Sequence, residues 1–341
     1  MLDGKSLEFD TVTLADTFLV ASLALLTDAL FGYPDRLFRW IGHPVSWIGR
    51  LIGWTDRHLN RDILPEQRRR LNGVLALLLL AGVPTLLAWM LQGACLALLP
   101  RAAALALLGL LGGTLSAQRS LWQHVRAVAD GLASDGLAGG RRAVSRIVGR
   151  DPLSLDEAGV VRAAIESLAE NFSDGVVAPL LWCAVFGLPG MVFYKAVNTA
   201  DSMIGHLSPR HGSFGWAAAR LDDWVNLPAS RLAALWIVLA ACCTRAGVAR
   251  EAVAAVRRDA RRHRSPNAGW PEAAMAGALG LRLAGPRSYA GTRVDDAWMG
   301  HGRPDAGPDD LARALAMYQW ACTIEAALLL VAAWAFRMGP S

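Results

Sequence analysis

The chain has 341 residues, of which 54% are hydrophobic and only 18% charged, and its mean hydropathy is +0.31. About a quarter of the residues are charged in soluble domains, so this composition excludes an ordinary soluble domain. The net charge of +5 would suit nucleic-acid binding, but the arginines cluster beside apolar segments, which is typical of cytoplasmic loops and predicts no nucleic-acid partner. We therefore expect an all-α, polytopic integral membrane protein with large cytoplasmic loops.

Six apolar segments follow along the chain, and four of them have the length and apolarity of membrane-spanning helices, which need roughly 20 residues. The four predicted spans lie at about residues 11–31, 73–93, 102–118 and 318–336.

Two further segments, 176–194 and 231–243, have two interpretations. The first contains proline and glycine and the second is short for a full crossing, so each is either a span or a re-entrant or broken helix. Four or six spans therefore remain open. No repeat or break in composition marks a second domain, so we expect a single membrane domain over residues 1–341.

Three long loops, 33–71, 119–165 and 244–317, are rich in arginine. Positive residues favour the cytoplasmic side, so all three loops are predicted to face the cytoplasm. The membrane itself is predicted to be the inner cell membrane. An active site formed by these loops would face the cytoplasm as well.

The first polar motif runs from Glu166 to Asp174 and leads into segment 176–194. In a continuing helix, residues four apart drift by only about 40°, so Glu166, Glu170 and Asp174 would share one face. A solvated helix end is the plain alternative. Ionisable groups beside a membrane usually mark a site, which favours catalytic roles for Glu166, Glu170, Asn171 and Asp174.

The second motif contains Lys195, Asn198 and Asp201 and follows the same apolar segment. Lys195 is one of only two lysines in a chain rich in arginine, so its compact ammonium group is a candidate for a specific contact. A helix-end anchor that reaches the membrane surface is the alternative. The i, i+3 spacing of Asn198 and Asp201 would let both reach one Mg²⁺ ion.

The third motif contains Arg220, Asp222 and Asp223, which could bind a metal or a polyphosphate. Adjacent residues on a helix point about 100° apart, so both carboxylates could hold one ion only in irregular structure.

The fourth motif begins at Arg258 in a basic stretch and continues through the turn Ser265-Pro-Asn267-Ala-Gly to Glu272. A basic anchor on anionic lipid accounts for most of the arginines. The turn is different, because its backbone N–H groups and Asn side chain are of the kind that hold phosphate or carboxylate oxygens. A weaker group contains Asp28, Tyr33 and His43, and since a lone His beside Pro is more often structural, His43 is assigned no role.

In this order, the motifs resemble the CobD/CbiB family of cobalamin biosynthesis, the membrane-bound adenosylcobinamide-phosphate synthases. The resemblance covers nearly the whole chain, and its most specific pair is the turn at 265–269 together with Lys-Ala-Val-Asn-Thr-Ala-Asp-Ser-Met at 195–203. Two places depart from the family pattern. Residues 206–213 differ in character, so His206 and His211 receive no catalytic role, and one extra residue before Arg231 leaves its role open.

The resemblance implies ATP-dependent amide formation between adenosylcobyric acid and aminopropanol or its phosphate. ATP and Mg²⁺ are the implied cofactors, and the lipid bilayer and other late membrane enzymes of the pathway are the partners to consider. Carboxylates at Glu170, Asp174 and Asp201 would hold Mg²⁺. Catalytic roles fall to Glu166, Glu170, Asn171, Asp174, Lys195, Asn198 and Asp201, and substrate or phosphate binding to Arg220, Asp222, Asp223, Arg258, Ser265, Asn267 and Glu272.

Two other classes of function compete with this one. A non-enzymatic AmpE-like signalling protein would not need polar clusters of both signs. A transporter would carry its charged motifs inside full spans rather than at their ends.

Overall fold

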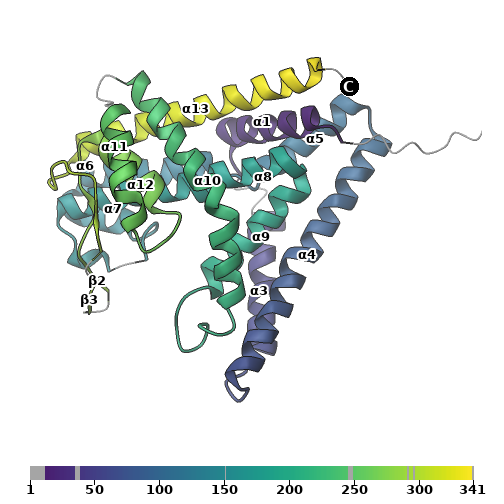
Figure 1. The fold of residues 1–341 in the computed structure, drawn as a ribbon, viewed down its shortest axis with the longest axis horizontal. Coiled ribbons are helices and arrows are strands. Elements are labelled where there is room, and N and C mark those ends of the chain that lie inside the picture. Colours follow the sequence, from purple (N-terminus) through teal and green to yellow (C-terminus); the bar gives the residue numbers. More distant parts are fainter. Residues whose placement is uncertain are drawn as a thin grey trace, which may run out of the picture. The chain divides into compact units, whose positions relative to one another are not determined.

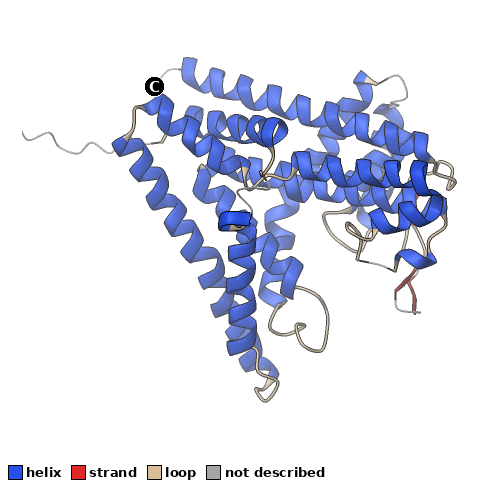
Figure 2. Cartoon of the chain, turned by 180° about the vertical axis from the view of Figure 1, so that it is seen from behind, coloured by secondary structure: helices blue, strands red, loops and turns tan. Residues whose placement is uncertain are grey.

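The computed structural model describes residues 12–34, 39–149, 151–244, 249–289, 292–294 and 296–339. The chain forms two compact units. Unit 1 contains the residues up to 116, residues 179–222 and those from 328 onward, and unit 2 contains residues 117–178 and 223–327. Helices dominate both units, and the few strands are two or three residues long (Figure 2), which confirms the predicted all-α class.

Unit 1 is built from long helices that pack in pairs. Its elements are α1 (Leu14–Phe31), α3 (Pro44–Leu59), α4 (Glu66–Leu98), α5 (Arg101–Gly113), α8 (Ala178–Phe186) and α9 (Leu188–Ile204), with parts of α10 (Trp216–Cys243) and α13 (Pro308–Met338). α1 packs on α5, and α3, α4 and α9 lie side by side (Figure 1). Glycines permit the close approach of α1 and α5, because Gly109 and Gly113 face Leu23 and Thr27 with no room for a side chain.

Unit 2 combines shorter helices with two small antiparallel sheets. Its helices are α6 (Gln118–Val144), α7 (Glu157–Phe172), a π-helix (Ser173–Val177), α11 (Ala249–Asp259) and α12 (Gly269–Leu279), with short 3₁₀ turns at Pro152–Ser154 and Ala260–Arg262. Strand β1 (Leu283–Ala284) pairs with β4 (Trp298–Met299), and β2 (Arg287–Tyr289) pairs with β3 (Thr292–Val294). α12 packs on both α7 and α11, so the buried faces of these three helices form one core.

Among the described residues, four helices are long and apolar enough to cross a membrane, namely α1, α4, α10 and α13. The chain is a membrane protein on this ground. One element differs from the predicted span at 102–118, and another contains segment 231–243, which the sequence leaves open. Helix α5 has only 13 residues, about 20 Å at 1.5 Å each, which is short of the roughly 30 Å of a bilayer core. Segment 231–243 is the apolar half of α10, whose 28 residues continue the helix back through polar sequence.

Segment 176–194 is interrupted at Gly187. This residue has φ of 71°, a left-handed conformation that Gly adopts readily, and it separates α8 from α9. The side chain of Gln92 on α4 completes the break, because its Oε1 accepts a 2.9 Å hydrogen bond from the N–H of Leu188. The helix is therefore broken, as the Pro and Gly content indicates, while a re-entrant path and the number of crossings stay predictions.

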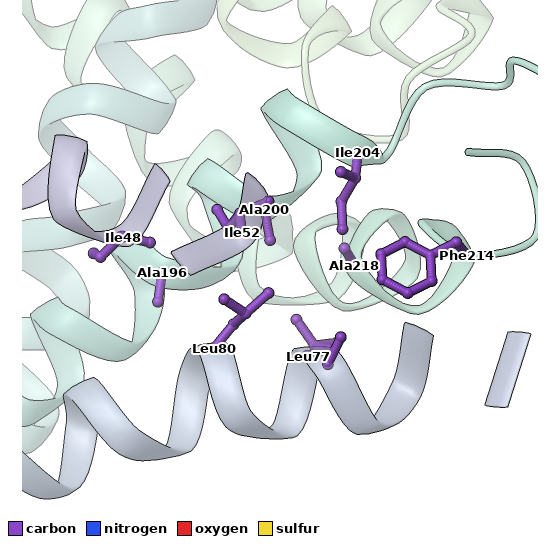
Figure 3. Close-up of a cluster of buried hydrophobic side chains, with 10 residues drawn as sticks. Ile48, Ile52, Leu77, Leu80, Ala196, Ala200, Ile204, Phe214 and Ala218 are labelled. Carbon is purple, nitrogen blue, oxygen red and sulfur yellow. The ribbon is translucent and has the colours of Figure 1, made fainter. Parts of the chain in front are cut away.

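A buried apolar cluster joins α3, α4, α9 and the start of α10 in unit 1 (Figure 3). Its members include Ile52 from α3, Leu80 from α4, and Ala196 and Ala200 from α9, each with no exposed surface. Ala196 and Ala200 immediately flank the polar positions of α9. The cluster thus fixes the rotation of α9 about its axis and decides which side chains of the second motif point away from the core.

Gly73 on α4 gives the first testable prediction. A Cβ atom at this position would overlap the backbone carbonyl of Phe214, whereas a Cβ at Gly82 on the same helix would meet nothing. Gly73→Ala is expected to destabilise unit 1 by about 1–3 kcal/mol, because backbone cannot move aside as a side chain can. Gly82→Ala should be neutral or slightly stabilising, since Ala is the better helix former. Thermal unfolding in detergent measures both, and equal unfolding temperatures would contradict the contact.

Candidate functional site

Three polar residues of the second and third motifs gather between α9 and α10 in unit 1. Asn198 and Lys195 lie three residues apart on α9 and so occupy neighbouring positions on its surface. The Nδ2 of Asn198 donates a 3.2 Å hydrogen bond to Oδ1 of Asp222 on α10, whose side chain is buried. The structure therefore brings a cation, an amide and a carboxylate together in one unit.

Asp201 lies one turn farther along α9, where the helix ends. Its carbonyl accepts a 2.7 Å hydrogen bond from the N–H of Gly205. Its carboxylate lies directly beside Gly205, so a side chain at that position would displace it. Gly205 thus allows the carboxylate of Asp201 to sit at the C-terminal end of α9.

His43 lies close enough to Lys195 to be affected by its charge, although the sequence-based prediction assigns it no role. It caps α3, with Nδ1 accepting a 3.2 Å hydrogen bond from the N–H of Val45, and its ring packs on Tyr33 at 4.4 Å between ring centres. Burial, and then the positive charge of Lys195, lowers the pKa of His43 below its ordinary value, so the ring is neutral at pH 7. The His-Pro pair that begins α3 signals a helix start, but nothing in the sequence places it near Lys195.

The loop between α9 and α10 is tied to α3 by an ionic network centred on Asp56. Arg210 Nη2 lies 2.8 Å from Oδ2 of Asp56, His211 Nε2 lies 3.4 Å from Oδ1, and Asn60 donates to the carbonyl of Arg210. Burial raises the pKa of Asp56, but the hydrogen bonds from Asn60 and Arg210 outweigh it and hold that pKa below its usual value. The network fixes the loop that connects Asn198 to Asp222.

In unit 2, the predicted turn at Ser265 and Asn267 is anchored to α10. Asn267 donates from Nδ2 to the carbonyl of Asp223 at 2.8 Å, and its Oδ1 accepts from Ser230 and Arg231 at 3.1 and 2.9 Å. Ser265 Oγ accepts from the N–H groups of Asn267 and Ala268. Both predicted binding side chains are therefore engaged within the protein, which favours a positioning role for them.

Arg231 on α10 contacts both the turn at 265–269 and the start of α12. Besides its hydrogen bond to Asn267, its guanidinium lies 4.4 Å from the ring centre of Trp270 at the start of α12. The extra residue by which this chain departs from the family pattern lies within α10. Arg231 still reaches Asn267 in the turn at 265–269.

Arg258 and Glu272 are also engaged inside unit 2. Arg258 makes two hydrogen bonds to the buried carboxylate of Asp259, at 2.9 and 2.6 Å, and the same carboxylate accepts from the N–H of Gly300. Glu272 is buried on α12, with His263 Nε2 at 3.8 Å from its Oε1. These two predicted binding residues thus help to hold α11, α12 and the β4 region together.

The acidic face predicted for Glu166, Glu170 and Asp174 is divided by the structure. Glu166 is buried, and its Oε1 accepts a 2.9 Å hydrogen bond from the N–H of Ala284, which has an unusual φ of 58°. Glu170 is exposed, as is Asn171, whose Nδ2 donates to the carbonyl of Ser167. Asp174 lies on the π-helix. The condition of a continuing α-helix is met for Glu166 and Glu170 on α7 but not for Asp174, because the chain widens into the π-turn after Phe172.

Arg220, Asp222 and Asp223 lie on regular helix in α10, not on irregular structure. The adjacent carboxylates therefore point about 100° apart and cannot share one ion. Asp222 belongs to unit 1 and pairs with Asn198, whereas Asp223 belongs to unit 2 and accepts from Asn267 through its carbonyl.

No group of three or more His, Cys, Asp or Glu side chains within the described ranges is arranged to hold a metal ion. Mg²⁺ commonly takes only one or two protein carboxylates, with substrate phosphates and water as its other ligands. Glu170, Asp174 and Asp201 as magnesium ligands stay a prediction.

The fold and these polar clusters define a helical membrane protein whose polar clusters contain both cationic and anionic side chains. The family model for the CobD/Cbib protein matches residues 21–318. A cobalamin biosynthesis protein CobD from Sinorhizobium sp is 51% identical over 317 residues, covering 92% of this chain and 98% of that protein. The CobD proteins of Rhizobium meliloti (strain 1021) and Rhodobacter capsulatus are each 50% identical, over 91% and 87% of this chain and 95% and 91% of theirs.

No solved structure matches the chain. The chain belongs to the CobD/CbiB family, as the sequence resemblance predicts. It is a membrane enzyme with a role in cobalamin biosynthesis.

Proposed function

We propose that the chain is an adenosylcobinamide-phosphate synthase, which joins adenosylcobyric acid to aminopropanol or its phosphate with consumption of ATP. The family membership supports the pathway, and the group formed by Lys195, Asn198 and Asp222 is the observation that supports the chemistry. A cation beside oxygen ligands is what a site for phosphate groups requires.

The reaction needs ATP because a carboxylate is a poor electrophile. In the proposed route, a carboxylate oxygen attacks the γ-phosphorus of ATP, and the bond to the β-phosphate oxygen breaks to release ADP. The amine nitrogen then attacks the acyl carbon of the resulting acyl phosphate. The C–O bond breaks, inorganic phosphate leaves, and the nitrogen loses a proton as the amide forms.

Each residue of the unit 1 group has a role in this proposal. The ammonium of Lys195 binds phosphate oxygens and stabilises the charge that grows on them in the transition state. Asn198 holds the carboxylate of Asp222 in one orientation through its hydrogen bond. Asp222 and the amide oxygen of Asn198 fit Mg²⁺, which when bound neutralises phosphate charge. The site is proposed to face the cytoplasm, where ATP is available.

In this proposal, some residues of unit 2 hold the region around α12 in place and others bind ligands. Ser265 and Asn267 fix the turn before α12, and Arg258 and Glu272 fix its surroundings, so this region would present a rigid surface to the corrinoid. Glu170, Asn171 and Asp174 lie at or beside the π-turn, a feature that often accompanies functional sites. We assign the carboxylates of Glu170 and Asp174 to Mg²⁺ or amine binding, with the amide of Asn171 beside them.

Purified protein in detergent tests the reaction directly. With adenosylcobyric acid, ATP and Mg²⁺, and either aminopropanol or its phosphate, the expected result is the matching amide with one ADP and one phosphate per turnover. Adenosylcobyric acid labelled with ¹⁸O in its free carboxylate should transfer one label to the released phosphate. Absence of product with both amines from folded protein would overturn the proposal in favour of a signalling or transport role.

A further inference from the structure

A groove in unit 1 is separate from the residues assigned to the reaction. It has a volume of about 950 Å³ and lies between the start of α1, the start of α5 and the last turns of α13. That volume is in the upper part of the range of small-molecule sites. Its long walls are apolar, formed by Leu19 and Leu23 on α1, Leu105 on α5, and Leu330 and Trp334 on α13.

Polar groups are confined to one end of this groove. Asp16 on α1, Arg101 on α5 and Arg337 on α13 all lie near a helix terminus. The apolar wall of α1 continues from Asp16 to Leu23, seven residues and therefore about 10 Å along the helix. The groove is thus polar at its mouth and apolar along its length, which is the order of groups in a phospholipid.

The charge at the mouth favours an anion. Asp16 is already satisfied, because Arg101 Nη2 lies 2.5 Å from its Oδ2 and Thr13 donates to it from both N–H and Oγ1. The exposed guanidinium of Arg337 makes neither an ion pair nor a hydrogen bond with any residue that the structure describes. One positive charge is therefore left over beside an apolar wall.

We propose that this groove binds an anionic phospholipid, with the phosphate against Arg337 and Arg101 and an acyl chain along Leu19, Leu23 and Leu105. A free anion would satisfy Arg337 but leave the apolar wall uncovered, whereas an apolar molecule would leave the charge unmatched. Basic groups near a membrane surface bind anionic lipid by this electrostatic attraction, and burial of each CH₂ adds to it. The site is a lipid-binding site that does not depend on the proposed reaction.

Binding of lipid to the folded state raises its stability, so thermal unfolding of detergent-purified protein measures occupancy. Added phosphatidylglycerol should raise the unfolding temperature by several degrees, and phosphatidylcholine by less. Arg337→Gln should lose most of the phosphatidylglycerol effect, and Arg337→Lys should keep much of it. Arg57→Gln, an exposed arginine on α3 of the same unit, is the charge-matched control and should respond like the unaltered protein.

Three results would overturn the proposal. Equal phosphatidylglycerol responses of Arg337→Gln and Arg57→Gln would show that the groove is not the binding site. Equal stabilisation by glycerol phosphate alone would show an anion site without a lipid. A lipid response that arises only after deletion of residues 2–11 would show that this segment of the chain is the native occupant.

Discussion

Lys195→Arg is expected to lower turnover of the purified protein at least ~100-fold although the positive charge is kept. Loss of one strong electrostatic stabiliser has an effect of this size. The ammonium of Lys195 is compact, whereas guanidinium is planar and larger, so it would misplace a phosphate held between Lys195 and the Asn198–Asp222 pair. Rates of amide formation at saturating ATP and amine measure the loss.

Membrane abundance and unfolding temperature serve as controls for this variant. Lys195 is only partly buried, whereas Ala196 beside it is fully buried in the apolar cluster, so Arg at residue 195 should leave stability nearly unchanged. Near-normal turnover at equal abundance would mean that Lys195 only anchors the helix at the membrane surface.

Sequence patterns predict the helical class of this protein because apolar runs of spanning length are a strong signal. They do not predict where such helices end. The start of α10 carries Arg220, Asp222 and Asp223, so hydropathy alone divides one helix of 28 residues into a polar loop and a short apolar segment. In segment 102–118, α5 stops at Gly113, and the predicted span extends beyond it through Thr-Leu-Ser-Ala-Gln, where the sequence is already more polar.

In the candidate site too, some contacts follow from local sequence spacing and others do not. Spacing along one helix predicts that Asn198 and Asp201 are neighbours on its surface, and both lie on the regular helix α9. The hydrogen bond of Asn267 with Arg231 joins residues 36 apart in sequence, and the charge of Lys195 on α9 acts on His43, which caps α3. Tertiary packing produces these pairs, and no local pattern encodes it. A regular pitch of 3.6 residues does not predict the π-turn at Ser173–Val177 either.

Replacement of Glu166 by Ala should lower mainly stability, and replacement of Asp174 by Ala should lower mainly turnover. A regular α-helix would place the two carboxylates on one face and predict similar effects. Glu166→Ala removes the buried acceptor of the Ala284 N–H group and leaves that donor unsatisfied, which costs about 1–3 kcal/mol and should lower the unfolding temperature. Asp174→Ala, at a half-exposed position, should leave the unfolding temperature nearly unchanged and lower turnover at least ~100-fold, as expected for loss of a hard-cation ligand or strong electrostatic stabiliser.

Turnover and thermal unfolding measured on the same two preparations separate these outcomes, and each variant controls for the other. Glu166→Ala protein that unfolds at the unaltered temperature but has lost its activity would assign Glu166 to the chemistry rather than to the anchoring of β1. Asp174→Ala protein with unaltered turnover would remove the π-turn from the site. Because Glu166 and Asp174 are on either side of Phe172, where the α-helix gives way to the π-turn, a split between stability and activity at that residue would show that the widened turn separates a structural carboxylate from a functional one.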